Sequence, residues 1–568
     1  MTGPADLAGE VARIDLLGGP QAILVDPEAI GADGTPVGNQ VRRLLTALGL
    51  EVVPIGAHKL MLTGITVAIF GRSHPLVTGC YAWYVGQGAG PRWMHPTAGD
   101  GPRTAVAILS FLGTGFAQER AGAAFRAAGA GRRLPRSSPY DAAAILGGIT
   151  EAVAPRAAVS RGAPVSSPPI DEWTRRQLLR QAFVALDRCC AANGAIAAAP
   201  PMAQRQGPDY WFFWQRDAAH AAFALQSLSI LGPDGDVRGG ARTRLDGYVA
   251  FIAELGPALA RHPPGIAAGR CTMAGTPVGG YGDPQHDGPA ATALAVLSVV
   301  EDPRSALAVA KPFLDHLLTL EPHHAGFDLW ELTVGTSFHA VNLARRALRR
   351  AADVGTVAED ADATSYRAAA ERLAFQLNAF RDPGLGGLVH TQGPQPPWFG
   401  ATTRLDMSVI GSTLLGYDVT DDVLNVDDRD MAATMRRLED HFATRWGVNA
   451  AWQLAGRVGG GIGRFPEDCN DGIGSTRGSP WPVTTLWAAQ YHLRRAQRCA
   501  HLASTDPPYQ DREIANGLAY LDFVLAHVDV TAISEQIDGV TGRARGASSL
   551  AWAHAELVTT LLARATLA

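Results

Sequence analysis

The stretch 326–331, with the sequence GFDLWE, combines two carboxylates with two aromatic residues. Glu331 directly follows Trp330, and a carboxyl group that loses water against an apolar ring keeps its proton to higher pH. Such a group can act as a general acid near neutral pH. Apolar residues then recur with a helical period, which predicts a helix over 331–353 with Glu331 in or beside its first turn. The alternative explanation is a glutamate favoured at that position by the helix dipole.

A second carboxylate, Glu535, lies in a loop between the last two predicted helices. By itself, a glutamate in a loop is most simply a solvated surface group. Together with Glu331 on one rim it suggests glycoside hydrolysis, in which one carboxyl group protonates the leaving oxygen and the other activates water. The distance between the two would decide between inversion and retention.

Three more loops carry side chains suited to a sugar. The first, 208–217, places five aromatic residues before the adjacent Arg216 and Asp217. Sugars bind through flat aromatic faces and through charged groups that hold hydroxyls, although an aromatic core patch with a helix-start acid explains the same pattern. The second loop, 279–290, contains an Asp-Gly-Pro sequence typical of a helix N-terminus. The third, 463–481, contains arginines, acids and a tryptophan.

Composition excludes several classes of protein. The 568 residues are 47% hydrophobic and carry a net charge of -5, which argues against a nucleic-acid-binding protein. The six cysteines form no CxxC pair, so neither a zinc site nor a disulfide framework is expected. No secretory signal and no membrane-spanning run is recognised. We therefore expect a soluble cytoplasmic protein with no cofactor, no metal ion, no nucleic-acid or membrane partner, and a small carbohydrate as its substrate.

The chain is predicted to contain two domains. Residues 1–150 alternate strands, near 21–25, 51–55, 65–70, 81–85 and 104–112, with helices, which favours a smaller α/β or mixed α+β domain. Residues 151–172 are rich in Pro, Ala, Ser and Arg, as linkers are. Residues 173–568 are almost entirely helical by pattern. Helices are predicted at 174–192, 215–231, 240–260, 287–300, 304–319, 331–353, 361–380, 403–416, 429–445, 481–501, 512–528 and 546–566. Twelve helices with chemistry-bearing loops between them suit a closed double ring, six inside and six outside.

These loops, in this order, resemble glycoside hydrolase family 15. That family holds glucoamylases, glucodextranases, isomaltose-cleaving glucohydrolases and some bacterial trehalases. The matching segments are WQRD at 214–217, DPQHDGPA at 283–290, DLWE at 328–331, RFPED at 464–468 and SEQ at 534–536. The resemblance implies an all-α (α/α)6 barrel and an inverting, single-displacement mechanism.

By this resemblance Glu331 is the general acid and Glu535 the general base. Arg216, Asp217 and Arg464 would hold hydroxyls of the terminal sugar in a deep pocket that admits only a chain end. The full set of predicted substrate-binding residues is Tyr210, Trp214, Arg216, Asp217, Tyr281, Asp283, Gln285, Asp287, Trp330, Arg464 and Trp481.

The departures from the family pattern fall where the leaving group would bind. Tyr281 replaces a tryptophan, Asp283 replaces an arginine, and Leu332 replaces an acid. Phe212 stands where a tyrosine is common. An arginine-to-aspartate exchange suggests an amine on the leaving group, as in an amino-sugar glycoside. Two competing functions are a carbohydrate-binding or regulatory protein that kept the barrel, and a phosphorylase.

Overall fold

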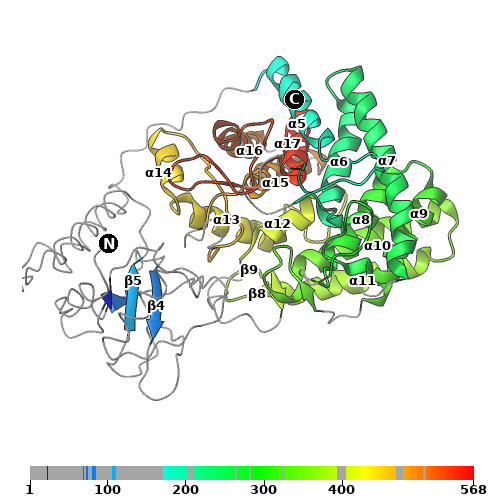
Figure 1. Ribbon diagram of the computed structural model, residues 1–568, viewed down its shortest axis with the longest axis horizontal. Coiled ribbons are helices and arrows are strands. Elements are labelled where there is room, and N and C mark those ends of the chain that lie inside the picture. The colour runs from blue at the N-terminus through cyan, green and yellow to red at the C-terminus, as the bar shows by residue number, and fades with distance from the viewer. Residues whose placement is uncertain are drawn as a thin grey trace, which may run out of the picture. The chain divides into compact units, whose positions relative to one another are not determined.

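The computed structural model describes most of the chain from residue 170 onward. The described ranges are 170–201, 210–261, 265–279, 283–320, 325–392, 405–468, 478–502 and 507–567, together with short strands nearer the N-terminus (Figure 1). The chain divides into two compact units, one formed by Met1–Ser160 with Glu467–Gly478 and the other by Arg161–Pro466 with Ser479–Ala568. The domain limits placed at residues 150 and 172 stay predictions.

The first unit contains two small groups of paired strands. The strands are β1 (Ala22–Ile23), β2 (Ala68–Ile69), β3 (Arg72–Ser73), β4 (Cys80–Tyr84) and β5 (Ala105–Leu109). β5 lies between β1, to which it is parallel, and β4, to which it is antiparallel, so this sheet is mixed. β2 and β3 pair separately and antiparallel. The strand predicted at 51–55 and the helices predicted in this region lie outside the described residues.

Six helices of the second unit form a closed inner ring. They are α6 (Gln215–Leu231), α8 (Asp287–Val299), α10 (Phe338–Ala358), α12 (Met407–Leu414), α15 (Pro482–His501) and α17 (Ala551–Ala565). Each helix contacts the next in this order, and α17 returns to contact α6.

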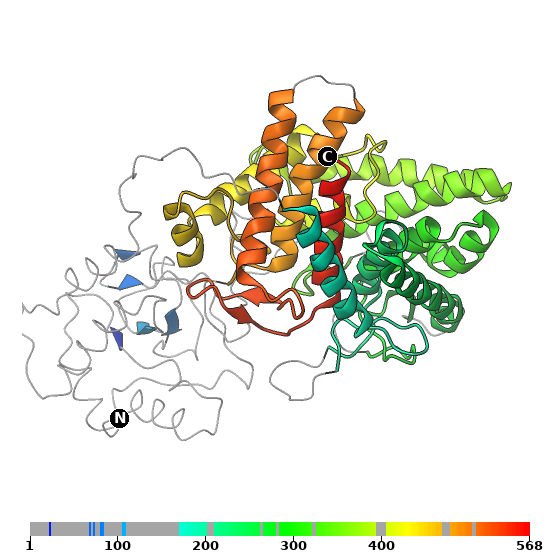
Figure 2. The ribbon, with the colours of Figure 1, turned by 90° about the horizontal axis from the view of Figure 1, so that it is seen from above.

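Six further helices surround this ring. They are α5 (Glu172–Asp187), α7 (Gly235–Ala260), α9 (Pro303–Thr319), α11 (Ala363–Leu377), α13 (Arg429–Ala443) and α16 (Pro507–His527). Each of α7, α9, α11, α13 and α16 packs on the inner helix that precedes it. α5 packs on α17, and Figure 2 shows these two helices side by side. The architecture is an (α/α)6 barrel, so the predicted fold class is confirmed. The short helix α14 (Gly447–Leu454), which contacts α13, was not predicted.

The two rings differ in which faces of their helices are apolar. Twelve of the thirteen residues of α8 are buried, and most of them are alanine or another small apolar residue. A helix that is apolar on all sides must be covered on all sides, which the inner position provides. The outer helix α13 instead buries one stripe, Met431, Met435, Leu438 and Phe442, at helical spacing.

Short strands and turns precede the inner helices. They are the 3-10 turns η2 (Gly265–Ala267) and η3 (Asn378–Phe380) and the strands β6 (Gly326–Phe327), β7 (Val334–Ser337), β8 (Arg381–Asp382), β9 (Gly387–Leu388), β10 (Thr391–Gln392), β11 (Gln536–Ile537) and β12 (Ala544–Arg545). β6 pairs with β7 and β11 pairs with β12, in both cases antiparallel. Both hairpins lie directly ahead of an inner helix, so they place their loops at the ends where those helices begin.

The predicted helix over 331–353 is wrong at its start. The helix α10 begins at Phe338, and residues 334–337 are the strand β7, which pairs with both β6 and β10. Glu331 therefore lies on the loop of a β-hairpin rather than in the first turn of a helix. Its placement owes nothing to the dipole of α10, and the helix-dipole explanation for this residue does not hold.

Candidate active site

The loop that carries Glu331 is shaped by Asp328. The backbone N–H of Asp328 donates to the carbonyl of Thr333, and its carboxylate accepts hydrogen bonds from Leu332 N at 2.8 Å and Thr333 Oγ1 at 2.6 Å. Asp328 is only 3% exposed. Glu331, at the tip of this turn, adopts the left-handed conformation with φ of 61°. Such backbone conformations are costly for non-glycine residues and occur often at functional sites, where the surrounding contacts impose them.

The carboxyl group of Glu331 is held through one of its two oxygens. Its Oε1 accepts hydrogen bonds from Trp214 Nε1 at 3.1 Å and Gln285 Nε2 at 2.8 Å, and it lies 3.8 Å from Arg216 Nη2. Burial raises the pKa of Glu331, and the charge of Arg216 and the two hydrogen bonds offset only part of this effect. The group is therefore suited to hold a proton on Oε2 and to release it to a bound atom.

Glu535 lies at the base of the hairpin formed by β11 and β12. Its backbone N–H donates to the carbonyl of Ala547 at 2.7 Å, and its Oε1 accepts a hydrogen bond from the hydroxyl of Tyr210 at 3.1 Å. Gly546 has φ of +76°, and a Cβ atom there would lie 2.5 Å from Oε2 of Glu535. Only glycine combines this backbone conformation with so close an approach to the carboxylate.

Tyr210 and Trp214 bring the two carboxylates into one site. Their rings make an edge-to-face contact with centroids 5.7 Å apart. Tyr210 donates to Glu535, and Trp214 donates to Glu331. Two acids that lie far apart in the sequence thus hydrogen bond to one pair of contacting aromatic residues.

A buried cluster of charges lies beside the proton donor. Arg216 pairs with Asp217 at 3.4 Å and with Asp287 at 3.2 Å, and all three residues are at most 6% exposed. Burial raises the pKa of Asp217, although the charges of Arg216 and of His220 lower it. The 3.4 Å ion pair joins Arg216 Nε to Asp217 Oδ2, and neither atom makes a hydrogen bond within the described part of the chain. Buried polar atoms nearly always have one, and a hydroxyl group can accept from the first while donating to the second.

An aromatic wall faces this cluster. The indole rings of Trp330 and Trp481 lie 5.8 Å apart, and the guanidinium of Arg464 lies 5.3 Å from the first and 4.7 Å from the second. Trp552 contacts Trp330 at 6.1 Å and lies 5.7 Å from the guanidinium of Arg216. Arginine on an aromatic face is attracted by the ring quadrupole. The wall therefore holds both cations in fixed positions.

Asp406 supports this aromatic wall through a hydrogen bond to Trp330. Its carboxylate accepts a hydrogen bond from Trp330 Nε1 at 2.8 Å and caps α12 by accepting another from Ser408 N at 2.6 Å. It is fully buried, and burial raises its pKa to about 6. Asp406 thus acts as a helix-start acid and fixes the tryptophan that precedes the proton donor.

The loop residues on the expected leaving-group side are only partly described. Tyr281 lies outside the described residues. Oδ1 of Asp283 accepts a hydrogen bond from the backbone N–H of Gly269 at 2.5 Å, which joins two loops. That bond gives Oδ1 a structural role, and the amine on the leaving group stays a prediction.

Sequence reasoning missed Arg270. Its guanidinium lies 4.6 Å from the ring of Phe212 and 5.6 Å from that of Trp214. It therefore packs against the tryptophan that donates to Glu331. No motif surrounds it in the sequence, and only the pairing of its neighbour Cys271 with Phe213 brings it to the site.

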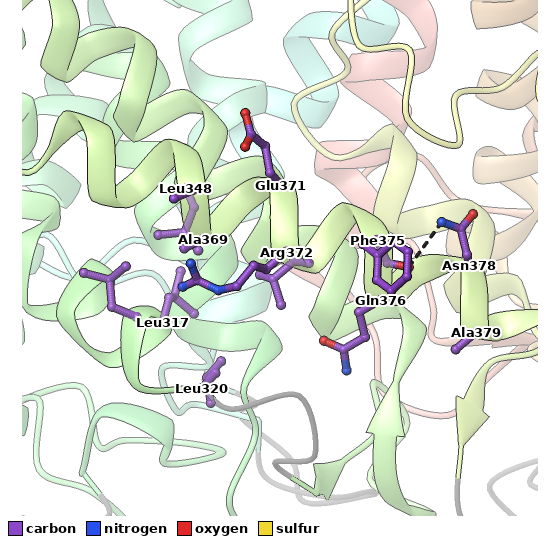
Figure 3. Close-up of a pocket in the computed structure, with 13 residues that line it drawn as sticks. Leu317, Leu320, Leu348, Ala369, Glu371, Arg372, Phe375, Gln376, Asn378 and Ala379 are labelled. Atoms are coloured by element: carbon purple, nitrogen blue, oxygen red, sulfur yellow. Dashed lines mark hydrogen bonds between the residues drawn. The ribbon is translucent and has the colours of Figure 1, made fainter.

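A separate cavity of about 1050 Å³ lies among α9, α10 and α11 (Figure 3). Its lining is mainly apolar and includes Leu317, Leu320 and Leu348, and the side chain of Arg372 extends toward Leu317 (Figure 3). None of the predicted site residues lines it, so it is distinct from the catalytic centre.

The family model for glycosyl hydrolases family 15 matches residues 185–562, which is most of the helical unit. The chain belongs to glycosyl hydrolase family 15. It is therefore a glycoside hydrolase. Glucoamylase 1 of Rhizopus oryzae is 26% identical over 460 residues, which cover 71% of this chain and 72% of that protein. A glucoamylase of Saccharomycopsis fibuligera is 24% identical over 448 residues, covering 64% and 83%.

The family fold extends to solved structures. The structure of a Saccharomycopsis fibuligera glucoamylase superposes with a TM-score of 0.60 at 21% identity, covering 72% of this chain and 99% of that one. At this identity the likeness shows a shared (α/α)6 barrel fold. Within the described residues, no helix is both long enough and apolar enough to cross a bilayer.

Proposed function

We propose that this family 15 enzyme is an inverting, exo-acting α-glucosidase that releases the terminal glucosyl residue of a short oligosaccharide or glycoside. The observation that carries the proposal is the Tyr210–Trp214 ring pair, because it joins one carboxylate that has a raised pKa to a second that accepts a tyrosine hydroxyl. The glucoamylases among its relatives support glucose as the sugar.

In the proposed reaction Glu331 is the general acid. Its Oε1 is occupied by donors from Trp214 and Gln285, so the transferable proton resides on Oε2. That proton moves to the glycosidic oxygen as the bond from this oxygen to the sugar carbon breaks. The negative charge left on Glu331 then strengthens both hydrogen bonds and the attraction to Arg216.

Glu535 is the proposed general base. A water molecule held by this carboxylate attacks the sugar carbon from the face opposite to the leaving group, and its proton passes to Glu535. The hydroxyl of Tyr210 keeps the carboxylate oriented through Oε1. Inversion requires the two carboxyl groups to stand roughly 6.5–9.5 Å apart, with room for water.

The sugar itself would be held by the buried charges. A hydroxyl that accepts from Arg216 Nε and donates to Asp217 Oδ2 would give a hydrogen bond to both atoms of the 3.4 Å ion pair, neither of which makes one among the described residues. Arg464, fixed against Trp481, supports a second hydroxyl contact from the opposite loop. Buried groups that all hydrogen bond to one terminal sugar leave no path for the chain to continue past it. This arrangement favours hydrolysis at a chain end.

The test is a screen of α-linked glucose disaccharides with NMR detection of the anomer first released. Release of β-glucose supports inversion, whereas release of α-glucose contradicts it. The variants Glu331→Gln and Glu535→Gln should each lose about 100- to 10,000-fold in kcat. Turnover that requires phosphate would identify a phosphorylase. A wild-type enzyme inactive on the whole panel would contradict the proposed glucosidase function.

A further inference from the structure

Gln285 is a buried glutamine whose side chain contacts both the sugar-holding cation and the proton donor. Its Oε1 accepts a hydrogen bond from Arg216 Nη1 at 3.1 Å, and its Nε2 donates to Oε1 of Glu331 at 2.8 Å. A guanidinium has only donors, so the amide oxygen must face Arg216 and the NH2 group must face Glu331. The side chain therefore has one possible orientation.

The loop that carries Gln285 holds its side chain in this position. The residue is 2% exposed, and its backbone N–H donates to the carbonyl of Ala267 at 2.8 Å. The neighbouring Asp287 accepts a second hydrogen bond from the same Nη1 of Arg216 at 3.2 Å. A displacement of Arg216 is consequently transmitted to the amide, and through the amide to the carboxyl group of Glu331.

We propose that Gln285 is a positioning residue that links sugar binding at Arg216 to proton donation by Glu331, and that it selects Oε2 as the oxygen carrying the proton. This inference rests on the proposed function. The family resemblance implies instead that Gln285 contacts substrate. The described geometry uses both ends of its amide for protein groups, so its effect on the reaction passes through Glu331.

The proton balance explains why this bond assists catalysis. The proton on Oε2 moves to the glycosidic oxygen, and the electron pair of the breaking bond leaves with that oxygen. Water forms the new bond to the sugar carbon, and its proton passes to Glu535. Glu331 becomes an anion during this step, and a hydrogen bond to an anion is stronger than one to a neutral carboxyl group. The amide thus stabilises the transition state more than the ground state.

Two substitutions test the two hydrogen bonds of the Gln285 amide. Gln285→Leu removes both hydrogen bonds, and we expect kcat to fall about 10- to 100-fold. Gln285→Glu keeps an acceptor for Arg216 but sets a carboxyl oxygen against Oε1 of Glu331. Two carboxyl groups so close share a proton, so the basic limb of the kcat–pH profile should move upward by about one pH unit.

Gln215 offers a matched control, because it is also a 2% exposed glutamine. Its Nε2 donates to the carbonyl of Ile266 at 2.7 Å. Gln215→Leu should lower thermal stability as much as Gln285→Leu does. The basic limb of its kcat–pH profile should stay at the wild-type pH. Equal losses of kcat in both leucine variants, or a basic limb unmoved in Gln285→Glu, would overturn the proposal.

Infrared titration separates this inference from the proposed function. The carboxyl stretch of Glu331, assigned by difference from Glu331→Gln, reports its protonation in the enzyme without substrate. A titration midpoint higher in Gln285→Glu than in wild type supports the link between amide and acid even if no glucoside is turned over. An identical midpoint in both proteins would refute that link, whatever the substrate is.

Discussion

Gly546→Ala tests whether the proposed base is held where the reaction needs it. The new Cβ would lie 2.5 Å from Oε2 and 3.0 Å from Cβ of Glu535. Ordinary van der Waals contact begins at 3.4 Å, so the carboxylate oxygen must move by about 0.9 Å. The glycine also has φ of +76°, which costs an alanine about 1–2 kcal/mol.

These two effects appear in different measurements. A misplacement of about 1 Å at a reacting group costs about 100-fold in rate, so kcat on the best disaccharide should fall by about that factor. The backbone cost should appear as a lower free energy of unfolding in urea. Gly386→Ala is the matched control, because Gly386 has φ of +57° and the nearest atom to its added Cβ is Arg437 Nη2 at 3.6 Å. This control should lose stability and retain kcat.

The reasoning fails if Gly546→Ala retains the wild-type kcat, since Glu535 would then tolerate a displaced position or take no part in the reaction. It also fails if Gly386→Ala loses as much activity as Gly546→Ala. In that case, general strain rather than contact with the carboxylate would explain the effect.

Two further predictions concern stability. His492 lies between the carboxylates of Glu439 and Glu513, at 2.7 and 2.6 Å, and its pKa is raised to about 9. Because the pKa of His492 is higher in the folded than in the unfolded protein, it contributes about 3 kcal/mol to the free energy of unfolding below pH 6.5, and this contribution is lost as pH rises through 9. In urea unfolding at increasing pH, His492→Gln should not show this decline. Asp421 accepts two hydrogen bonds from the buried Arg345, at 3.0 and 2.6 Å. Asp421→Ala should lower the free energy of unfolding by about 3–5 kcal/mol.

An exposed ion pair provides the comparison for Asp421. Asp353 and Arg367 are 3.4 Å apart, and each is about half exposed. Asp353→Ala should change the free energy of unfolding by less than about 1 kcal/mol. Equal losses from the buried and the exposed pair would show that burial does not set the strength of these contacts.

The periodic spacing of hydrophobic residues was sufficient to predict the helices of the barrel. Each of the twelve predicted segments corresponds to a helix. Twelve long helices that are amphipathic or fully apolar have few other ways to bury their apolar surface. The short α14 was missed, since eight residues give too little period to detect. The start of α10 was misplaced because Val334 and Phe338 fit a helical repeat as well as a strand followed by a helix.

The sequence pointed to the site residues that stand in recognisable motifs. It missed the residue that only a tertiary pairing brings to the site. Glu331, Glu535 and Arg216 stand in recognisable segments, and the structure brings all three to the Tyr210–Trp214 pair. Arg270 reaches the site through a strand pairing that no local pattern announces. The cytoplasmic location stays a prediction.

The contact of α17 with both α5 and α6 has a consequence for the order in which the enzyme matures. Tyr210 comes from the beginning of the barrel and Glu535 from near its end, so their hydrogen bond can form only after the hairpin that follows α16 has been synthesised. A chain that ends before this hairpin lacks Glu535 and so cannot assemble both halves of the proposed acid–base pair. If Glu331 and Glu535 act as proposed, hydrolysis requires the last helix pair of the barrel as well as the first.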